Sequence, residues 1–468
     1  MSIKIYNTLT RRKEEFKPLK EGNVGIYVCG PTVYDAPHIG HARSAYAFDV
    51  IRRYFIYKDY KVEFVRNVTD VDDKIINKAK EEFKGEDLNV AVKSVSDKYL
   101  KVYHDYMEKL GIMQPDVEPK ATEYIEKMGN FIKILIERGV AYASGGDVYF
   151  NVRKANGYGK LSNQSFEMLE SGARIAQGEN KKDPLDFALW KSVKSDEPSW
   201  PSPWGNGRPG WHIECSVMSS DILGDEFDIH GGGIDLVFPH HENEAAQSEG
   251  AGKKFARYWI HNGLLTINKE KMSKSLGNFI TIEDILAKYP ADVLKILFLQ
   301  THYSHPVDFS WEKMDEAKRA YERIDILMKK LKDIKEEITS DKDIDGYRLK
   351  FEEVMDDDFN TAQALGIIFE IVTFINKNIE NEKQAGYAKK TLIDLGKVLG
   401  LFEGLTRHYS MEFSETIALT ESVNLLIKNR NKAREKKDFK EADRIRKELE
   451  EKGVILEDTK NGTTWRIK

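Results

Sequence analysis

Short apolar runs and helical stripes alternate along the first part of the chain. Residues 24–28 form an apolar run that ends at the turn Cys29-Gly30-Pro31, which is typical of a short buried strand. Residues 42–54 carry apolar positions at helical spacing, and residues 61–68 alternate as in a strand. Strand, helix and strand in this order predict the opening of a parallel α/β sheet of the Rossmann-like type.

The pattern changes after residue 120. A helical stripe at 124–138 is followed by short strand-like pieces such as residues 147–152, and residues 196–210, rich in Pro, Gly, Ser and Trp, predict an ordered loop. Strand-like segments at 225–230 and 258–265 then predict the second half of the sheet. We therefore interpret the middle of this region as an insertion into the α/β domain.

Periodicity becomes helical after Pro306. Four apolar stripes among charges predict a helical bundle, at residues 314–332, 347–356, 361–379 and 390–401. The turn Asn461-Gly462 between two apolar segments predicts a small hairpin near the end. The predicted division is residues 1–120 and 196–265 for the two halves of the Rossmann-like domain, 121–195 for the insertion, 266–312 for a linking region, 313–405 for the bundle and 406–468 for a small mixed C-terminal domain.

Composition limits the class of protein. The chain has 468 residues, of which 41% are hydrophobic, so several domains can each bury a core. The first residues run straight into the charged stretch 11–15, and no run of about 20 apolar residues follows, so we expect a cytoplasmic protein without a membrane span. Two cysteines, Cys29 and Cys215, exclude a disulfide framework and fit a reducing compartment.

Charge is unevenly distributed. The net charge of −5 excludes a polycation that binds nucleic acid as a whole. Residues 428–468, however, contain 14 Lys and Arg against 9 Asp and Glu. A basic end on an acidic body indicates a local contact with a polyanion, although a solvated charged helix surface explains the same composition equally well.

Two short motifs carry candidate chemistry. His38-Ile39-Gly40-His41 opens the first predicted helix at the carboxyl end of a strand, where nucleotides bind, and imidazole N–H groups there can donate to phosphate oxygens. Lys271-Met272-Ser273-Lys274-Ser275 offers two ammonium groups to the charge that develops on a leaving pyrophosphate. Alone, each motif is more often a core or loop segment. As a pair they favour ATP-dependent activation of a carboxylic acid.

The pair resembles the HIGH and KMSKS signatures of class I aminoacyl-tRNA synthetases, without substitution. The order of first signature, insertion, second signature and helical region also matches that family. The resemblance implies that residues 266–312, which carry the second signature, contact the tRNA stem, and that the bundle 313–405 and the C-terminal domain 406–468 bind the tRNA and its anticodon. The resemblance implies that His38 and His41 contact the phosphates of ATP, which binds with Mg²⁺, and that Gly40 admits the adenosine. It further implies that Lys274, with Lys271, stabilises the pentavalent α-phosphate.

A candidate metal set lies around these motifs. Cys29, Cys215, His240 and Glu244 are competent zinc ligands, and the i, i+4 spacing of the last two places them on one face of a helix. Because the four are dispersed, the fold must bring them together. Two buried core cysteines remain the alternative interpretation.

Longer stretches narrow the resemblance to the cysteinyl-tRNA synthetases, over nearly the whole chain. They are residues 29–35, 67–74, 186–191, 210–216 and 230–244. The resemblance implies one zinc ion on Cys29, Cys215, His240 and Glu244 that takes the substrate's thiolate as a further ligand. It also implies that Thr69 and Trp211 flank the bound L-cysteine and that Asp235 holds the ribose hydroxyls. Thr69 as a strand-end cap and Trp211 as a core residue are the ordinary alternatives.

Zinc suits such a substrate. A pocket selecting by shape separates near-isosteres such as cysteine and serine by only ~10²-fold, whereas zinc binds a thiolate far more readily than an alcohol. Selection at binding makes an editing site unnecessary, so we interpret the insertion as structural or as a contact with the tRNA acceptor stem.

Three rival functions agree less well with the sequence. A zinc protease is excluded, because the segment His241-Glu242 continues to Ala245 where a second histidine must stand. A ligase that transfers cysteine to a non-tRNA amine would lack the long C-terminal region, and a non-catalytic tRNA-binding paralogue would carry degraded signatures. We therefore expect a monomeric cysteine–tRNA ligase, with Trp465, Arg466 and the basic stretch 428–447 contacting the anticodon of tRNA(Cys).

Overall fold

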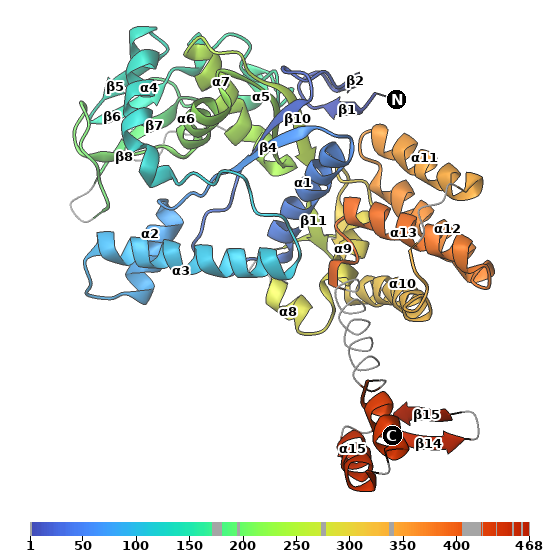
Figure 1. Ribbon diagram of the computed structural model, residues 1–468. Coiled ribbons are helices and arrows are strands. Elements are labelled where there is room, and N and C mark those ends of the chain that lie inside the picture. Colours follow the sequence, from blue (N-terminus) through green and yellow to red (C-terminus); the bar gives the residue numbers. More distant parts are fainter. Residues whose placement is uncertain are drawn as a thin grey trace.

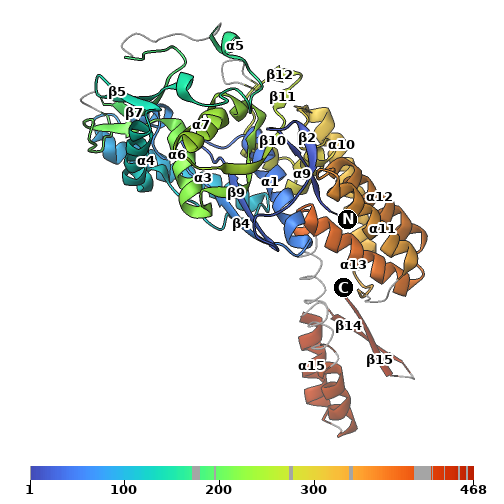
Figure 2. The same cartoon turned by 90° about the horizontal axis from the view of Figure 1, so that it is seen from above.

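A computed structural model describes most of the 468-residue chain. The described residues are 2–170, 180–193, 197–272, 278–336, 341–404, 423, 425–436, 438–451, 454–459 and 462–467. In both views an insertion and a helical bundle lie on opposite sides of a central sheet (Figures 1 and 2). None of the helices within these ranges is both long and apolar enough to cross a membrane.

The central sheet is parallel, as predicted. It contains β3 (Asn23–Val28), β4 (Lys61–Arg66), β9 (Glu226–Gly233) and β10 (Phe255–Asn262), in the order β10-β9-β3-β4. Helix α1 (Ile39–Tyr57) joins β3 to β4. Because strand side chains alternate, Val24, Ile26 and Val28 join the core under α1, whereas Tyr27 joins the core under α6 (Trp211–Leu223) on the other face.

The N-terminal hairpin and a pair of helices complete this half. Strands β1 (Lys4–Asn7) and β2 (Arg12–Glu15) pair antiparallel, and β1 lies beside β10. No element is expected from the sequence between residues 69 and 120, yet α2 (Asp73–Glu82) and α3 (Leu88–Lys109) pack together there. The caps Asp72 and Asp87 start both helices by accepting backbone N–H bonds, a signal that the sequence did contain.

The insertion forms its own antiparallel sheet. Its order is β5 (Ala141–Ser144), β6 (Asp147–Phe150), β7 (Phe187–Ser192) and β8 (Gly207–Pro209), preceded by a 3₁₀ turn (Ala121–Tyr124) and α4 (Ile125–Glu137). A second 3₁₀ turn (Val152–Lys154) and α5 (Phe166–Glu170) follow β6. Strand β8 lies beyond residue 195, so the chain returns through the insertion's sheet before entering α6. The domain division itself stays a prediction.

The second half of the sheet leads into the linking region. A 3₁₀ turn (Ile234–Leu236) and a π-turn (Val237–His241) connect β9 to α7 (Glu242–Gly250). After β10 come β11 (Leu265–Ile267), β12 (Glu270–Lys271), α8 (Ile282–Leu286), α9 (Ala291–Leu299) and β13 (Val307–Phe309). Strand β11 pairs with both β12 and β13.

The predicted bundle and hairpin are both confirmed. The bundle consists of α10 (Trp311–Lys330), α11 (Lys342–Asp356), α12 (Thr361–Lys377) and α13 (Glu382–Val398), whose apolar stripes join the same core as α1. Helix α15 (Phe439–Glu451) and the hairpin β14 (Val454–Thr459) and β15 (Gly462–Ile467) follow, with a small separate core that includes Ile445 and Leu449.

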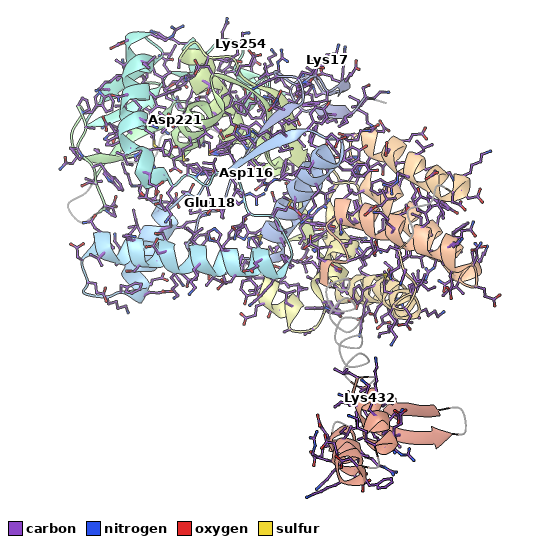
Figure 3. The ribbon with its side chains drawn as sticks, viewed as in Figure 1. Lys17, Asp116, Glu118, Asp221, Lys254 and Lys432 are labelled. Carbon is purple, nitrogen blue, oxygen red and sulfur yellow. The ribbon has the colours of Figure 1, made fainter. Side chains whose placement is uncertain are left out.

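Ion pairs join distant segments in the N-terminal half of the chain. Asp116, labelled in Figure 3, accepts from Arg52 of α1 at 2.7 Å and from the backbone N–H of Phe64 in β4 at 2.7 Å. Asp221 on α6, also labelled, accepts from Lys127 on α4 at 2.6 Å. The first pair ties α1 to its sheet, and the second ties the insertion to α6.

Helix α1 packs so closely on the sheet that Gly231 in β9 has no room for a side chain. A Cβ atom at Gly231 would lie 2.2 Å from the Phe48 ring, whereas one at Gly366 in α12 would meet nothing within 4 Å. We expect Gly231→Ala to destabilise the fold by ~1–3 kcal/mol through overpacking. Gly366→Ala should be stabilising by ~0.5–1 kcal/mol, because alanine is the better helix former.

Thermal denaturation of the two variants and the unmodified chain measures both effects. A lower midpoint for Gly231→Ala and a higher one for Gly366→Ala are expected. Equal midpoints would contradict this account of the packing.

Candidate active site

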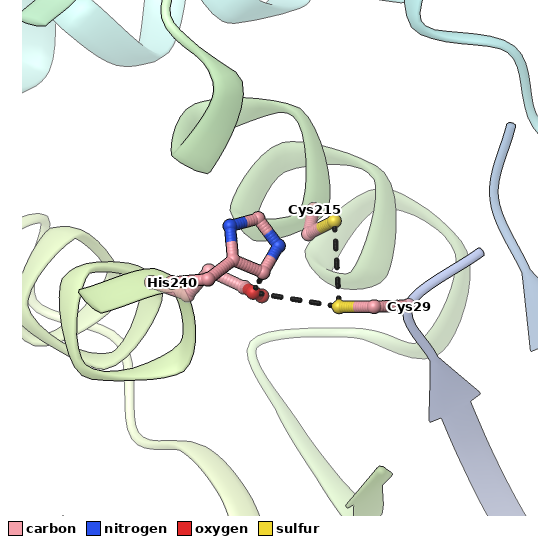
Figure 4. A group of neighbouring side chains, drawn as sticks. Cys29, Cys215 and His240 are labelled. Carbon is pink, nitrogen blue, oxygen red and sulfur yellow. Dashed lines mark hydrogen bonds and ion pairs between the residues drawn. The ribbon is translucent and has the colours of Figure 1, made fainter. Parts of the chain in front are cut away.

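Four candidate metal ligands meet at one edge of the central sheet. Cys29 follows β3, Cys215 lies in the second turn of α6, and His240 and Glu244 straddle the start of α7. Figure 4 shows Cys29, Cys215 and His240 pointing toward one another from separate elements. The ligand atoms of all four lie within 4.8 Å of one another, and every residue except Cys29 is fully buried. The fold therefore assembles the dispersed set that the sequence predicted.

The spacing of the four ligand atoms fits a tetrahedral ion. Bonds of ~2.3 Å to sulfur and ~2.0 Å to nitrogen or oxygen imply separations of about 3.8 Å between sulfurs, 3.5 Å from sulfur to oxygen and 3.3 Å from nitrogen to oxygen. The two Sγ atoms are 3.7 Å apart, Cys29 Sγ lies 3.5 Å from Glu244 Oε1, and His240 Nε2 lies 3.0 Å from the same oxygen. Only small adjustments are needed to close the site around a metal.

The electrostatics of the set also fit a cation. Burial alone would raise the pKa of Glu244, but His230 and His240 lower it to about 2. Burial likewise opposes a Cys215 thiolate, but hydrogen bonds with Cys29 and His240 lower that pKa to about 6. In turn Glu244 and Cys215, acting against burial, raise the pKa of His240 to about 10. Two buried anions here stabilise a positive charge, which a metal can supply when His240 is neutral.

A shell of imidazoles surrounds the set and was not predicted. His230 Nε2 lies 2.8 Å from Glu244 Oε2, and His241 Nε2 lies 3.3 Å from Cys29 Sγ. With Cys29 and Glu244, these two rings form a second group of potential metal ligands. His230 engages one carboxylate oxygen and leaves Oε1 facing Cys29 and His240. Orientation of a ligand by a second residue in this manner is common at metal sites. The run of histidines near Glu244 was the available signal.

The HIGH motif forms the first turn of α1. His38 is the N-cap, and its Nδ1 accepts from the N–H of Gly40 at 3.0 Å, while Nδ1 of His41 accepts from the N–H of His38 at 3.3 Å. The two rings stack with centroids 3.8 Å apart. Because both Nδ1 atoms are acceptors, each neutral ring carries its proton on Nε2 and keeps one donor for a ligand. A Cβ at Gly40 would lie 2.8 Å from the His38 ring, so glycine also serves this stacking.

The segment after the second signature is bonded to the first signature. The N–H of Ile39 donates to the carbonyl of Ile280 at 3.2 Å, and that of Ile282 donates to the carbonyl of Pro37 at 3.1 Å. Before the loop, Lys271 pairs with Thr266 through the backbone and Met272 packs against the main core. Lys274 lies outside the described residues. The segment after the predicted phosphate-contacting residues is thus bonded to the HIGH turn, and the Met272 side chain before them would lie 3.6 Å from a Cβ at Gly40.

The three predicted substrate residues lie in different surroundings. Thr69 is buried just after β4 and donates to Glu214 Oε2 at 2.8 Å, a partner that sequence reasoning missed. The Trp211 ring stacks on His240 with centroids 4.1 Å apart and is 40% exposed, so it is not an ordinary core residue. Asp235 is exposed in the turn after β9. Their roles toward a ligand stay predictions.

The glycines before Asp235 have a structural reason. Cβ atoms at Gly231 and Gly232 would meet the Phe48 ring at 2.2 Å and the His241 ring at 2.8 Å. Close packing within the protein therefore explains why these two positions lack a side chain. Trp465 and Arg466 lie in β15, opposite Leu456 and Ile455.

Comparisons with known proteins agree along the chain. The family model described as "tRNA synthetases class I (C) catalytic domain" matches residues 15–319, a DALR domain matches 350–403, and a "Cysteinyl-tRNA ligase anticodon binding domain" matches 416–466. Similar curated proteins include the cysteine–tRNA ligases of Sulfurihydrogenibium sp., 50% identical, and Thermodesulfovibrio yellowstonii, 48% identical, each with 100% of both chains covered.

A solved structure supports the fold. The Mycobacterium tuberculosis methionyl-tRNA synthetase in complex with methionyl-adenylate aligns with a TM-score of 0.57 at 15% identity. The alignment covers 81% of this chain and 89% of that one. The predicted class of fold, a Rossmann-like domain followed by helices, is confirmed.

The protonation of the HIGH histidines can be tested directly. Burial lowers the pKa of His38 to about 4, and burial, with the charges of His38 and Lys74, lowers that of His41 to about 3. Imidazole NMR should therefore show both rings neutral at pH 7. An unfolded histidine has a pKa of about 6.5. Between the folded and the unfolded pKa values the unfolded chain therefore binds more protons than the folded one. Both residues should then lower the free energy of unfolding as the pH falls below about 6.5. Midpoints near 6.5 in the folded protein would contradict the assignment.

Proposed function

The chain belongs to the class I tRNA synthetase family, together with the cysteine–tRNA ligases, and we propose that it charges tRNA(Cys) with L-cysteine in a cytoplasmic, monomeric form. The observation that carries the proposal is the convergence of Cys29, Cys215, His240 and Glu244 at the end of β3, the strand that leads to the HIGH turn. A thiol-selective group next to an ATP site is what activation of cysteine requires.

The proposed metal is one Zn²⁺ ion per chain. Two sulfurs, an imidazole and a carboxylate are a typical donor set for zinc, and their separations suit tetrahedral bonds. When bound, zinc would lower the pKa of a coordinated thiol, so that L-cysteine is held as its thiolate. Trp211 stacks on His240 and is partly exposed, which supports a role as one wall of the amino-acid pocket.

Activation is the first proposed step. The carboxylate of cysteine attacks the α-phosphorus of ATP, which binds with Mg²⁺, and pyrophosphate leaves as cysteinyl-adenylate forms. His38 and His41 donate from Nε2 to phosphate oxygens, and Lys271 and Lys274 stabilise charge on the pentavalent α-phosphate. Gly40 lies where the adenosine approaches α1, and the exposed Asp235 carboxylate accepts from the ribose hydroxyls. No protein nucleophile is needed, so positioning and charge stabilisation supply the rate.

Thr69 acts in orienting the substrate. Its hydroxyl donates to Glu214, so its oxygen lone pairs remain able to accept from the ammonium group of cysteine.

In the second step a ribose hydroxyl of the terminal adenosine of tRNA attacks the acyl carbon and AMP leaves. Trp465 and Arg466 bind the anticodon by stacking and phosphate pairing.

A cysteine ligase with a non-tRNA acceptor is not favoured. The anticodon-binding family model matches residues 416–466, and the curated relatives are covered from end to end. The HIGH and KMSKS residues are all retained, which also argues against a non-catalytic paralogue.

Metal-dependent selection is tested by cysteine-dependent exchange of pyrophosphate into ATP. We expect exchange with cysteine to exceed that with serine by more than ~10²-fold, the limit for a pocket that selects by shape. A chelator should abolish the preference, and His240→Gln should lower both metal content and exchange at least tenfold.

His104→Gln is the matched control. His104 pairs with Glu118, labelled in Figure 3, at 2.8 Å on the surface of α3, far from the metal ligands in sequence. This variant should retain metal and activity. Equal exchange with cysteine and serine, or indifference to the chelator, would refute selection by the metal.

If Trp465 binds the anticodon, its replacement should affect the charging of tRNA and leave the activation of cysteine unchanged. Trp465→Ala should raise the KM for tRNA about tenfold, the usual effect of losing one stacked base, and leave exchange intact because activation does not involve tRNA. Trp465→Phe should restore most of the loss. Unchanged tRNA kinetics in Trp465→Ala would remove Trp465 from the interface.

A further inference from the structure

A hollow of about 440 Å³ is lined by Asp70, the residue after Thr69, and by none of the proposed metal, ATP or amino-acid ligands. We call it the Trp200 pocket. Its walls come from the segment after β4, from α3, from the start of the insertion and from the loop before β8, and include Asp70, Asn89, Lys93, Asp97, Lys120 and Trp200. The volume lies in the range of small-ligand sites.

The floor of the Trp200 pocket is shared with the amino-acid site. Asp70 follows Thr69, whose side chain donates to Glu214, the residue before the candidate metal ligand Cys215. The Asp70 carboxylate is buried and accepts from the backbone N–H and the hydroxyl of Thr122 at 3.0 and 2.5 Å. These bonds hold the floor in place, so a group in the pocket is separated from the amino-acid site by one short segment of chain.

Trp200 offers a rigid aromatic surface. Its backbone N–H donates to the carbonyl of Gly207 at 2.8 Å, and the N–H of Gly207 donates back at 3.0 Å. The side chain packs on the insertion core yet stays partly exposed at the pocket. A ring held at its base in this way can stack on a planar group at little entropic cost.

The opposite wall supplies polar groups. Lys93 and Lys120 both donate to Asp97, at 2.6 and 3.4 Å, and the Lys93 side chain is 74% exposed. Each ammonium has three donors, so both retain capacity for a phosphate. Asp97 and the exposed Asn89 can accept from an exocyclic amino group. An aromatic ring, cations and hydrogen-bond acceptors for an amino group are the groups that bind a nucleotide with an unpaired base.

We propose that the Trp200 pocket binds one of the two cytidines that precede the terminal adenosine in the single-stranded 3′ end of tRNA. Its base stacks on Trp200, its N4 amino group donates to Asp97 or Asn89, and its phosphate contacts Lys93 or Lys120. The inference rests on the proposed function, because the terminal adenosine must reach the acyl group on the other side of the Thr69–Asp70 segment. The nucleotide before it must then lie close by.

The test compares equilibrium binding of intact tRNA(Cys) and of tRNA(Cys) lacking its last three nucleotides. Trp200→Ala and Lys93→Ala should each weaken binding of the intact tRNA, Trp200→Ala by about tenfold, the effect of one lost base stack. Neither should weaken binding of the shortened tRNA by more than about twofold, because the contact is already absent.

Two control variants separate contact from folding. Trp200→Phe keeps a stacking ring, and Lys101→Ala removes an exposed lysine of the same helix that does not line the pocket. Both should bind intact tRNA as the unmodified chain does, and cysteine-dependent pyrophosphate exchange reports whether each variant retains its active site.

Three results would overturn the pocket assignment. They are equal weakening for both tRNAs, no weakening in either variant, and binding of free CMP that depends on Trp200 and matches the affinity for tRNA. The last would make the pocket a site for free nucleotides. If the unmodified chain exchanges no pyrophosphate with cysteine and charges no tRNA, the proposed function fails instead, so the two failures are distinguishable.

Discussion

The convergence of two thiols, an imidazole and a carboxylate at the edge of the sheet is the constraint on which the site depends. Glu244 is fully buried with its pKa held at about 2, and Cys215 is buried beside it. Anions in a low-dielectric interior are tolerated only with a compensating positive charge. Strand β3, helix α6 and the turn into α7 each carry part of the set. The site therefore forms only when these three elements pack together.

The nucleotide half of the site is built on the same strand. Chain leaving β3 passes Cys29 and, after a short loop, enters α1 at His38. Backbone bonds from Ile39 to Ile280 and from Ile282 to Pro37 then join this turn to the segment after the second signature. The segment that follows the second signature is therefore bonded to the turn that contains His38.

Local signals predicted much of this arrangement. The apolar run before Cys29 and the i, i+4 pair His240 and Glu244 were readable because their geometry depends on neighbours in sequence. What could not be read depends on distant partners: Phe48 explains Gly231 only once α1 lies on β9. The pairing of β8 with β7 and the partner of Thr69 were missed for the same reason. Helices α2 and α3 were missed although their signals are local: Asp72 and Asp87 cap them, and α3 carries Val92, Val95 and Tyr99 at helical spacing.

X-ray absorption at the zinc edge tests the central claim most directly, since it counts the atoms around the metal without relying on activity. The purified chain should contain one zinc with two sulfur neighbours at ~2.3 Å and two nitrogen or oxygen neighbours at ~2.0 Å. Addition of L-cysteine should raise the sulfur count to three, and L-serine should leave it at two. A count that stays at two with cysteine, or zinc without sulfur neighbours, would contradict a metal that selects the substrate by its thiolate.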